Sequence, residues 1–165
     1  MRQIVLIAHN LRSAHNVGSL IRTAEGLGLE SVYLTGYTPY PRLPGDQRLP
    51  HLADRVARRI NKTALGAEEL VDLKHEDQLE TVIALLKADG FRIIGLEQTP
   101  GSLALSEYRP AAKIALVVGR EVEGLEAEVL NLCDQLIEIP MLGSKESFNV
   151  AVAAAMALYH LRFMV

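Results

Sequence analysis

The amino-acid sequence predicts an α/β domain with a mostly parallel sheet that is covered by helices on both faces. Short apolar runs rich in Val and Ile alternate with segments of helical periodicity, the pattern of parallel strands joined by crossover helices. The chain has 165 residues, a length that fits one domain able to bury about two-thirds of its unfolded surface. We therefore expect a single domain that spans residues 1–165.

The first expected elements are a strand, a helix and a second strand. Residues 4–8 form a continuous apolar run, typical of a strand that is buried on both faces. After a polar loop, a helix is expected to open at Asn16, which is a good N-cap, and to end at Gly26 or Gly28. Residues 31–35 are the next expected strand.

The middle of the chain is expected to be a loop followed by two helices. Residues 36–50 contain four prolines and two glycines, which predicts a long loop. Residues 51–60 are expected to form a short basic helix. Residues 76–88 place apolar side chains on one helical face, and Gly90 ends that helix.

The C-terminal part is expected to contribute three further strands. A final helix made largely of Ala and Val follows a Gly-containing loop, with Ser147 or Asn149 as its cap. The expected strands are residues 92–96, 113–118 and 135–139, with a helix over residues 125–132.

Three strand ends carry polar residues, and ligands bind beyond the carboxyl ends of the strands in such sheets. The first, after Ile7, leads to Asn16, Gly18 and Arg22; the alternative is a capped helix with an arginine facing solvent. The other two are the segment 119–124, which follows Val118, and the segment 140–149, which follows Ile139; each can also be a simple helix cap.

Composition excludes several classes of protein. The formal net charge of −3 gives no general attraction to nucleic acid, and one cysteine, Cys133, excludes an internal disulfide framework. No signal peptide is recognisable, and the longest apolar run, residues 150–159, is too short to cross a bilayer. The histidines lack ligand-like spacing, so no metal is expected. We expect a cytoplasmic protein without a membrane or metal partner.

Three motifs, in chain order, resemble those of the SpoU/TrmH-type RNA methyltransferases of the SPOUT superfamily. They are Asn16-x-Gly18-x-x-x-Arg22-x-Ala24, then Gly119-x-Glu121-x-x-Gly124, and Ile139-Pro140-Met141 leading to Ser147-x-Asn149. The segment Lys62-Thr63-Ala64-Leu65-Gly66-Ala67 also looks like one often seen in this family. The resemblance covers essentially the whole chain.

The resemblance implies a C-terminal trefoil knot, an exception to the usual absence of knots, and a homodimer. The apolar final helix agrees with a dimer, although it can equally be monomer core. The family uses S-adenosylmethionine as the methyl donor for a ribose 2′-hydroxyl. By similarity, the residues around the cofactor would be Leu96, Gly119, Ile139, Met141, Ser147 and Phe148.

The family pattern places Arg22 at the reacting hydroxyl, often as the base. Because the pKa of arginine exceeds 12, a charged Arg22 that holds a phosphate and stabilises the developing alkoxide is physically easier. Asn16 and Glu121 would orient Arg22 or bind the ribose, with Glu121 paired to its guanidinium. Ser147 and Asn149 would close the pocket. Arg120 departs from the family pattern and is either an extra phosphate contact or a surface charge.

A basic window supplies the expected RNA contacts. Between residues 42 and 62, six basic and two acidic residues give a local charge of +4, which suits phosphate binding, although a solvated basic helix is the alternative. With no separate RNA-binding extension expected, tRNA is favoured over rRNA as substrate. The expected RNA contacts are Arg22, Arg48, Arg55, Arg58, Arg59 and Lys62.

Three other functions remain open. One is a base-methylating SPOUT enzyme, for example one acting on guanine N1, against which the Arg22 motif argues. Another is a non-catalytic RNA- or nucleotide-binding protein with the same fold. The third is an unrelated doubly wound domain that binds a small phosphorylated ligand. It would not bind S-adenosylmethionine.

Overall fold

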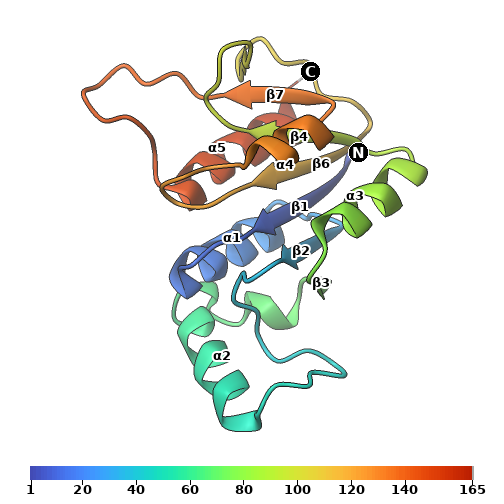
Figure 1. Ribbon diagram of the computed structural model, residues 1–165, viewed down its shortest axis with the longest axis vertical. Helices are drawn as coiled ribbons and strands as arrows, with labels where there is room; N and C mark the ends of the chain where they lie inside the picture. Colours follow the sequence, from blue (N-terminus) through green and yellow to red (C-terminus); the bar gives the residue numbers. More distant parts are fainter. Residues whose placement is uncertain (165) are drawn as a thin grey trace.

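The computed structural model describes residues 1–164, which form a seven-stranded sheet whose neighbouring strands are all parallel (Figure 1). The strand order is β3-β2-β1-β6-β4-β7-β5. The strands are β1 (Gln3–His9), β2 (Ser31–Thr35), β3 (Leu73–Glu76), β4 (Arg92–Leu96), β5 (Leu103–Ala104), β6 (Lys113–Val118) and β7 (Gln135–Glu138). The helices are α1 (Ala14–Gly26), α2 (Pro50–Ala64), the 3₁₀ helix η1 (Ala67–Glu69), α3 (Leu79–Ala88), α4 (Ala127–Leu132) and α5 (Val150–Phe163).

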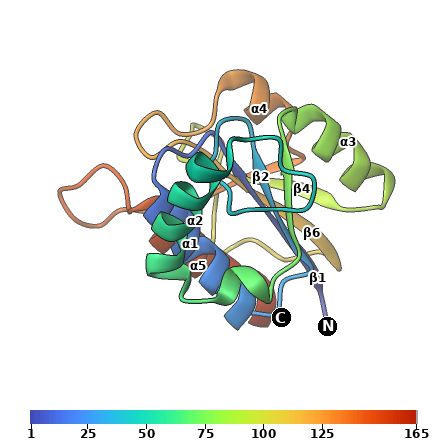
Figure 2. The ribbon, with the colours of Figure 1, turned by 90° about the horizontal axis from the view of Figure 1, so that it is seen from below.

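Helices cover both faces of the sheet, which confirms the predicted α/β architecture. Figure 2 shows α1, α2 and α5 on one face and α3 and α4 on the other. The alternation of side chains along β1 divides the core accordingly. Ile4 and Leu6 pack in the cluster with α1 and α5, whereas Val5 and Ile7 pack in the cluster with α3 and α4. Within residues 1–164, no helix is long and apolar enough to cross a membrane.

Two strands were not predicted from the sequence. β3 is an edge strand that pairs with β2 through Val32 and Leu73, and its sequence Leu-Lys-His-Glu is mostly polar because only one side of it is covered. The expected helix over residues 76–88 therefore begins only at Leu79. β5 has two residues and is recognisable only from its pairing with β7.

The boundaries of three helices differ from expectation. α1 begins at Ala14 and is capped by Ser13, whose side chain accepts a hydrogen bond from the Asn16 N–H, so the prediction of Asn16 as the cap was wrong. α2 is longer than expected and ends where Leu65 and Gly66 adopt positive φ. α4 begins at Ala127, two residues later than predicted.

Gly18 allows α1 and α2 to approach each other closely. A Cβ atom at Gly18 would lie 2.2 Å from Thr63 Oγ1 and 2.3 Å from the carbonyl oxygen of Ile60. The Thr63 hydroxyl donates a hydrogen bond of 2.8 Å to the carbonyl of His15 across the same contact. The absence of a side chain at Gly18 thus lets the backbone of α2 lie against α1.

Replacing Gly18 by Val should destabilise the protein by about 1–3 kcal/mol, because the new side chain would have to push α2 away from α1. The free energy of unfolding in urea measures the effect. Gly26→Ala is the matched control in the same helix, since nothing lies within 4 Å of its Cβ position. It should be neutral or stabilising by up to about 1 kcal/mol. Equal losses at the two positions would contradict this account of the α1–α2 contact.

Candidate active site

A cleft lies at the carboxyl ends of the neighbouring strands β6, β4 and β7. Its walls are the ends of these strands, the turn that follows β6 and the start of α5. This is where ligands bind in parallel α/β sheets. The residues predicted at a cofactor all line this cleft, and they are Leu96, Gly119, Ile139, Met141, Ser147 and Phe148.

The turn after β6 is tight and depends on two glycines. The backbone N–H groups of Arg120 and Gly124 each donate to the other residue's carbonyl at 3.2 Å. A Cβ at Gly119 would lie 2.6 Å from the Gly124 carbonyl oxygen, and Gly124 has a φ of +70°. Side chains at these positions would open the turn and move the wall of the cleft.

Glu97 supports this turn from the end of β4 and was not predicted as a site residue. Its carboxylate accepts hydrogen bonds from the N–H of Leu125 at 2.7 Å and of Gln98 at 3.0 Å. Glu97 also lines the cleft. Glu97 directly follows a buried strand, so its position in the sequence could have identified it as a site residue.

Glu121 joins the turn after β6 to the start of α1. Its Oε1 accepts hydrogen bonds from the N–H of Ser13 at 2.9 Å and from the side-chain amide of Asn16 at 3.1 Å. Its Oε2 accepts from the N–H of Arg12 at 3.1 Å. Three donors thus surround a single carboxylate at the edge of the cleft.

These donors also set the ionisation of Glu121. Burial by itself raises the pKa of the carboxyl group, but the N–H groups of Ser13 and Arg12 and the amide of Asn16 favour the charged form more strongly. The pKa of Glu121 is consequently below its ordinary value, and the group is ionised at neutral pH.

Asn149, from the third motif, joins the hydrogen-bond network of Glu121 and Asn16. Its side-chain amide donates to Asn16 Oδ1 at 3.2 Å, and its own Oδ1 caps α5 by accepting from the N–H of Ala151 at 2.9 Å. The expectation that Ser147 or Asn149 caps the helix is met by Asn149. A chain of hydrogen bonds from Glu121 through Asn16 to Asn149 therefore joins the three motifs.

Arg22 stands apart from this network. It is exposed on α1 and lies, with Lys62 and Thr63 of α2, around a separate shallow depression. Within residues 1–164 of one chain, the Glu121 carboxylate accepts hydrogen bonds from Asn16 and two backbone N–H groups and not from Arg22, so the pairing of Arg22 with Glu121 stays a prediction. Arg22 follows Asn16 by six residues, about 9 Å along the helix and on another side of it.

The Arg120 side chain lies against the protein and does not extend freely into solvent. It forms an ion pair with Glu126, and its Nε is buried without a hydrogen-bond partner among residues 1–164. Of the two interpretations offered for Arg120, the ion pair with Glu126 favours a surface charge in the free protein.

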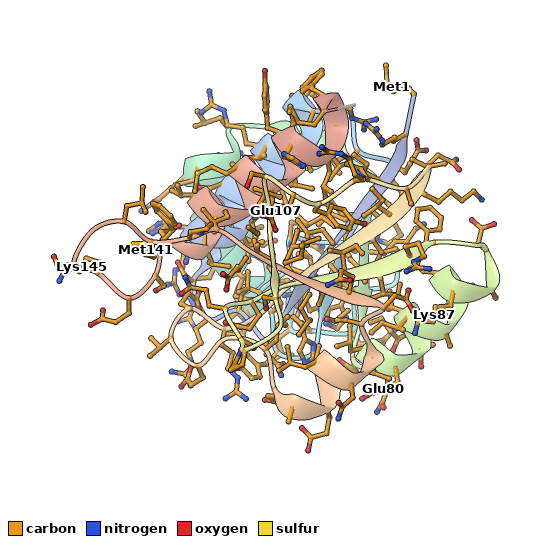
Figure 3. All side chains as sticks on the ribbon, turned by 90° about the horizontal axis from the view of Figure 1, so that it is seen from above. Met1, Glu80, Lys87, Glu107, Met141 and Lys145 are labelled. Atoms are coloured by element: carbon orange, nitrogen blue, oxygen red, sulfur yellow. The ribbon has the colours of Figure 1, made fainter. Side chains whose placement is uncertain are left out.

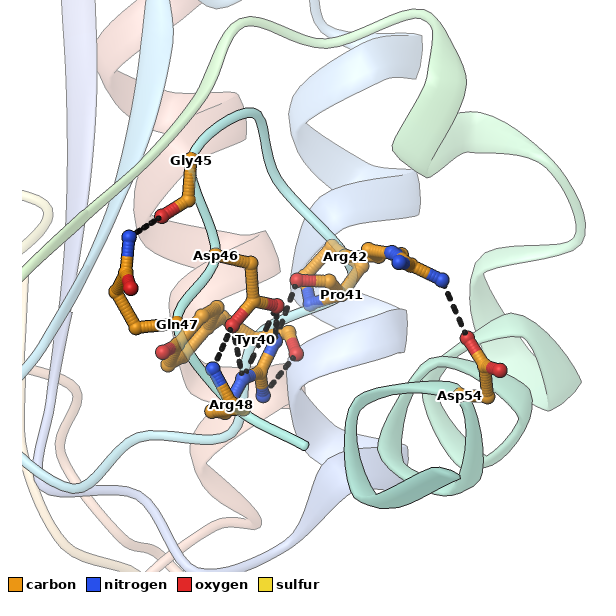
Figure 4. A network of polar contacts seen from close by, with 8 residues as sticks. All are labelled: Tyr40, Pro41, Arg42, Gly45, Asp46, Gln47, Arg48 and Asp54. Carbon is orange, nitrogen blue, oxygen red and sulfur yellow. Dashed lines mark hydrogen bonds and ion pairs between the residues drawn. The ribbon is translucent and has the colours of Figure 1, made fainter. Parts of the chain in front are cut away.

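The basic residues of α2 share one exposed face. They are Arg55, Arg58, Arg59 and Lys62, spaced by three and four residues as on one side of a helix. Arg48 is different, because its Nε donates to Asp46 at 2.9 Å and its guanidinium lies 3.5 Å from the centre of the Tyr40 ring (Figure 4). Its remaining donors bind the carbonyls of Tyr40 and Pro41, so Arg48 holds its own loop together.

The loop between β7 and α5 projects from the body of the protein (Figure 1), and its residues Met141 and Ser147 line the cleft. Figure 3 shows Met141 near the base of this loop and Lys145 at its outer end. Leu142 is 99% exposed. The loop therefore presents both apolar and charged groups to solvent beside the cleft.

Within residues 1–164, no group of three or more His, Cys, Asp or Glu side chains is arranged to hold a metal ion. Burial raises the pKa of the Cys133 thiol to about 11, which makes it a poor nucleophile at neutral pH.

Solved structures with this fold define the class of protein. An AdoMet-bound rRNA methyltransferase from Sinorhizobium meliloti superposes with a TM-score of 0.83 at 22% identity, covering 97% of this chain and 56% of that one. A structure described as giving insights into the 2-OH methylation of C/U34 on tRNA has a TM-score of 0.72 at 26% identity, with 97% and 94% covered. The chain thus has the fold of the SPOUT methyltransferases.

Sequence comparison then gives the family. The model of the SpoU rRNA Methylase family matches residues 46–159, and the chain belongs to this family. It is 28% identical to the tRNA (guanosine(18)-2′-O)-methyltransferase of Borreliella burgdorferi, covering 96% of this chain and 65% of that protein. The chain spans 37–65% of the length of the curated relatives it matches.

Glu121→Gln should lower the free energy of unfolding by about 1 kcal/mol at neutral pH, because a charged acceptor is lost at a partly exposed site. Since the folded-state pKa of Glu121 is depressed, this contribution is full above the ordinary value of about 4.5 and disappears as pH falls through the folded pKa. Urea unfolding of wild type and variant between neutral pH and about pH 3.5 measures the difference.

Glu123→Gln is the control for this measurement, because Glu123 is exposed and pairs only with exposed Arg12 among the described residues. It should change stability by less than about 0.5 kcal/mol at every pH. A Glu121→Gln effect that is independent of pH would show that the charge of Glu121 does not stabilise the network.

Proposed function

We propose that this protein is an S-adenosylmethionine-dependent RNA methyltransferase that modifies a ribose 2′-hydroxyl, with tRNA favoured over rRNA, in the cytoplasm. The network Glu121–Asn16–Asn149 carries the proposal, because its hydrogen bonds join the three motifs that resemble those of the SpoU/TrmH family and because Glu121 lines the cleft. The related proteins named above, which act on tRNA or rRNA, support the same activity.

The residues of the cleft fit the proposed cofactor. Leu96, Ile139 and Phe148 offer apolar surface for a nucleobase, and the missing Cβ at Gly119 leaves backbone groups accessible beside them. Three carboxylates, those of Glu97, Glu121 and Glu138, line the cleft against one arginine, which suits a positively charged sulfonium. When bound, S-adenosylmethionine supplies the electrophilic methyl group. We infer that the C-terminal region also has the trefoil knot of the class.

In the proposed reaction, the protein positions a ribose hydroxyl for attack and stabilises the oxygen as it loses its proton. Positioning alone is worth up to about 7–11 kcal/mol. Asn16 and Asn149 hold the walls of the site through their mutual hydrogen bond, and the Ser147 hydroxyl lies on its lining. Arg22 stays charged, binds the adjoining phosphate and stabilises the developing alkoxide.

Because Arg22 lies outside the cleft of its own chain, we assign it to the cleft of a second copy in a homodimer. The surface of α5 supports such a dimer. Along one side of this helix, Val152, Tyr159 and Phe163 are each at least half exposed. Their spacing of seven and four residues puts them on one face. A single chain therefore leaves part of its apolar final helix in water, and a second copy would cover it.

RNA binding is assigned to α2 and the neighbouring part of α1. Arg55, Arg58 and Arg59 project from the exposed face of α2, while Lys62 of the same face borders the depression that includes Arg22. The positive charge thus continues from the helix to the proposed catalytic arginine, as phosphate binding requires. Arg48 is withdrawn from the predicted RNA contacts, because its donors are occupied within its loop.

Similarity to a structure that concerns methylation of C/U34 on tRNA favours tRNA, since the present chain covers 94% of its length. The first experiment offers labelled S-adenosylmethionine with unmodified tRNA and, separately, rRNA to wild type and Arg22→Ala. Digestion to nucleosides locates the label.

Wild type should label a 2′-O-methyl nucleoside, and Arg22→Ala should lose at least about 100-fold in rate while still binding the cofactor, because an electrostatic stabiliser is removed. Label on a base would instead assign a base-methylating enzyme. Cofactor binding without transfer to RNA, or no cofactor binding, would overturn the proposed function.

Mixing two inactive variants tests the sharing of the site between protomers. A heterodimer of Arg22→Ala with Glu121→Ala should regain activity, since one of its two sites combines an intact cleft with an intact arginine. Co-expression with two affinity tags isolates the heterodimer for the assay. Its activity should approach half that of wild type.

The homodimers of each variant are the controls and should remain inactive. A heterodimer as inactive as they are would place Arg22 and the cleft within one chain. Tyr159→Glu should convert the protein to a monomer in analytical ultracentrifugation, whereas Leu70→Glu, at an exposed apolar residue far from α5 in sequence, should leave the dimer intact.

A further inference from the structure

Arg12 and Tyr37 have no role in the reaction described so far, and a hydrogen bond of 3.0 Å from the Leu11 N–H to Thr38 Oγ1 joins their two loops. The N–H of Arg12 is bound by Glu121, the carboxylate that lines the cleft, at 3.1 Å. The Arg12 side chain is 62% exposed and Tyr37 is 54% exposed. A cation and an aromatic ring are thus presented to solvent beside the proposed active site.

The backbone around Tyr37 is held by a strained arrangement. Asn10 has a φ of +55°, which is uncommon for a residue other than glycine, and its Oδ1 accepts the N–H of Tyr37 at 3.2 Å. Gly36 is required beside it, because a Cβ there would lie 2.1 Å from Asn10 Oδ1. The Asn10 amide also bonds to His9 Nε2 at 3.0 Å. Strain of this kind is a reason to look for function.

The guanidinium of Arg12 is held by contacts that a ligand can replace. It pairs with Glu123 at 3.1 Å, and both partners are exposed, so the pair is weak. The Tyr37 hydroxyl and then Glu123 raise the pKa of Arg12, and an arginine is charged at neutral pH in any case. A phosphate could take the place of Glu123 without uncovering a buried charge.

We propose that Arg12 and Tyr37 form a nucleotide-binding subsite, in which the Tyr37 ring stacks on a base next to the methylated ribose and Arg12 binds a backbone phosphate. The inference rests on the proposed function and deepens it, because it says how the RNA strand is held at the cleft. Stacking on an exposed aromatic ring is the usual way to hold an unpaired base, and it reads no sequence.

The subsite differs from the basic face of α2 in position and in chemistry. It follows β1 and β2 at the carboxyl edge of the sheet, on the side of Glu121. It therefore binds the nucleotides at the reaction centre, whereas α2 binds phosphates farther along the RNA.

The test measures RNA affinity in the presence of S-adenosylmethionine for four variants of the full chain: Arg12→Ala, Tyr37→Ala, Tyr37→Phe and Glu123→Gln. Arg92→Ala is the matched control for loss of charge, because Arg92 is exposed at the opposite end of the sheet, at the start of β4. Calorimetry measures cofactor affinity and thermal unfolding checks the fold of each variant.

Tyr37→Ala and Arg12→Ala should each weaken RNA binding by about tenfold or more while cofactor affinity stays within about twofold. Tyr37→Phe keeps the ring and should bind RNA as wild type does. Arg12→Ala should also reduce the slope of log affinity against log salt by about 0.7–0.9. Glu123→Gln should bind RNA as well as wild type or more tightly, because it frees Arg12.

Two results would overturn the subsite: Tyr37→Ala binds RNA as tightly as wild type, or Arg12→Ala weakens binding no more than Arg92→Ala does. If the wild type methylates RNA, the proposed function would still stand. A wild-type protein that binds the cofactor but methylates no RNA would overturn the proposed function, and the subsite with it.

Discussion

The site depends on the hydrogen bonds that the carboxylate of Glu121 accepts. The loops that follow β1, β6 and β7 are far apart in the sequence, and they are brought into one arrangement because this group accepts three hydrogen bonds from the start of α1. Asn16 passes the connection on to Asn149, which in turn caps α5. Charged acceptors form stronger hydrogen bonds than neutral ones, so one ionised side chain can set the geometry of three loops. Glu97 plays a similar part within a shorter span, by fixing the turn that carries Glu121.

The buried parts of the sheet were predictable because burial on both faces requires a continuous apolar run. β1, β2, β4 and β6 contain such runs and were placed within about two residues, as was β7, whose central Leu136 and Ile137 are apolar. β3 was missed because an edge strand covered on one side needs few apolar residues. Three of its four residues, Lys74, His75 and Glu76, are polar, so its sequence has no strand pattern. β5 was missed because two residues carry no periodic pattern, and only its pairing with β7 defines it.

The sequence predicted residues that do line the cleft, but it did not predict the contacts between the motifs. The three motifs pointed to a cleft that the structure does contain, yet Asn16 was mistaken for a cap because Ser13, three residues earlier, offers the same chemistry. Capping by Ser13 leaves the Asn16 side chain available for Glu121 and Asn149. Arg48 counted as a free charge in the sequence, but three-dimensional contacts with Tyr40 and Asp46 occupy it. Such pairings depend on the path of the loops, which a linear charge count does not contain.

Helix α1 also fixes the distance and the rotation between Asn16 and Arg22. The first turn of α1 is bonded to Glu121 through the Asn16 side chain, and the helix packs closely against α2 at Gly18. Arg22 lies on a later turn of the same helix. The position of Arg22 relative to Asn16 is thus set by the number of residues between them, because each residue adds a rise of about 1.5 Å and a rotation of about 100°. Inserting one residue between Asn16 and Arg22 would rotate Arg22 by about 100° around the helix axis relative to Asn16. The number of residues between Asn16 and Arg22 therefore fixes where the arginine would reach in the proposed dimer.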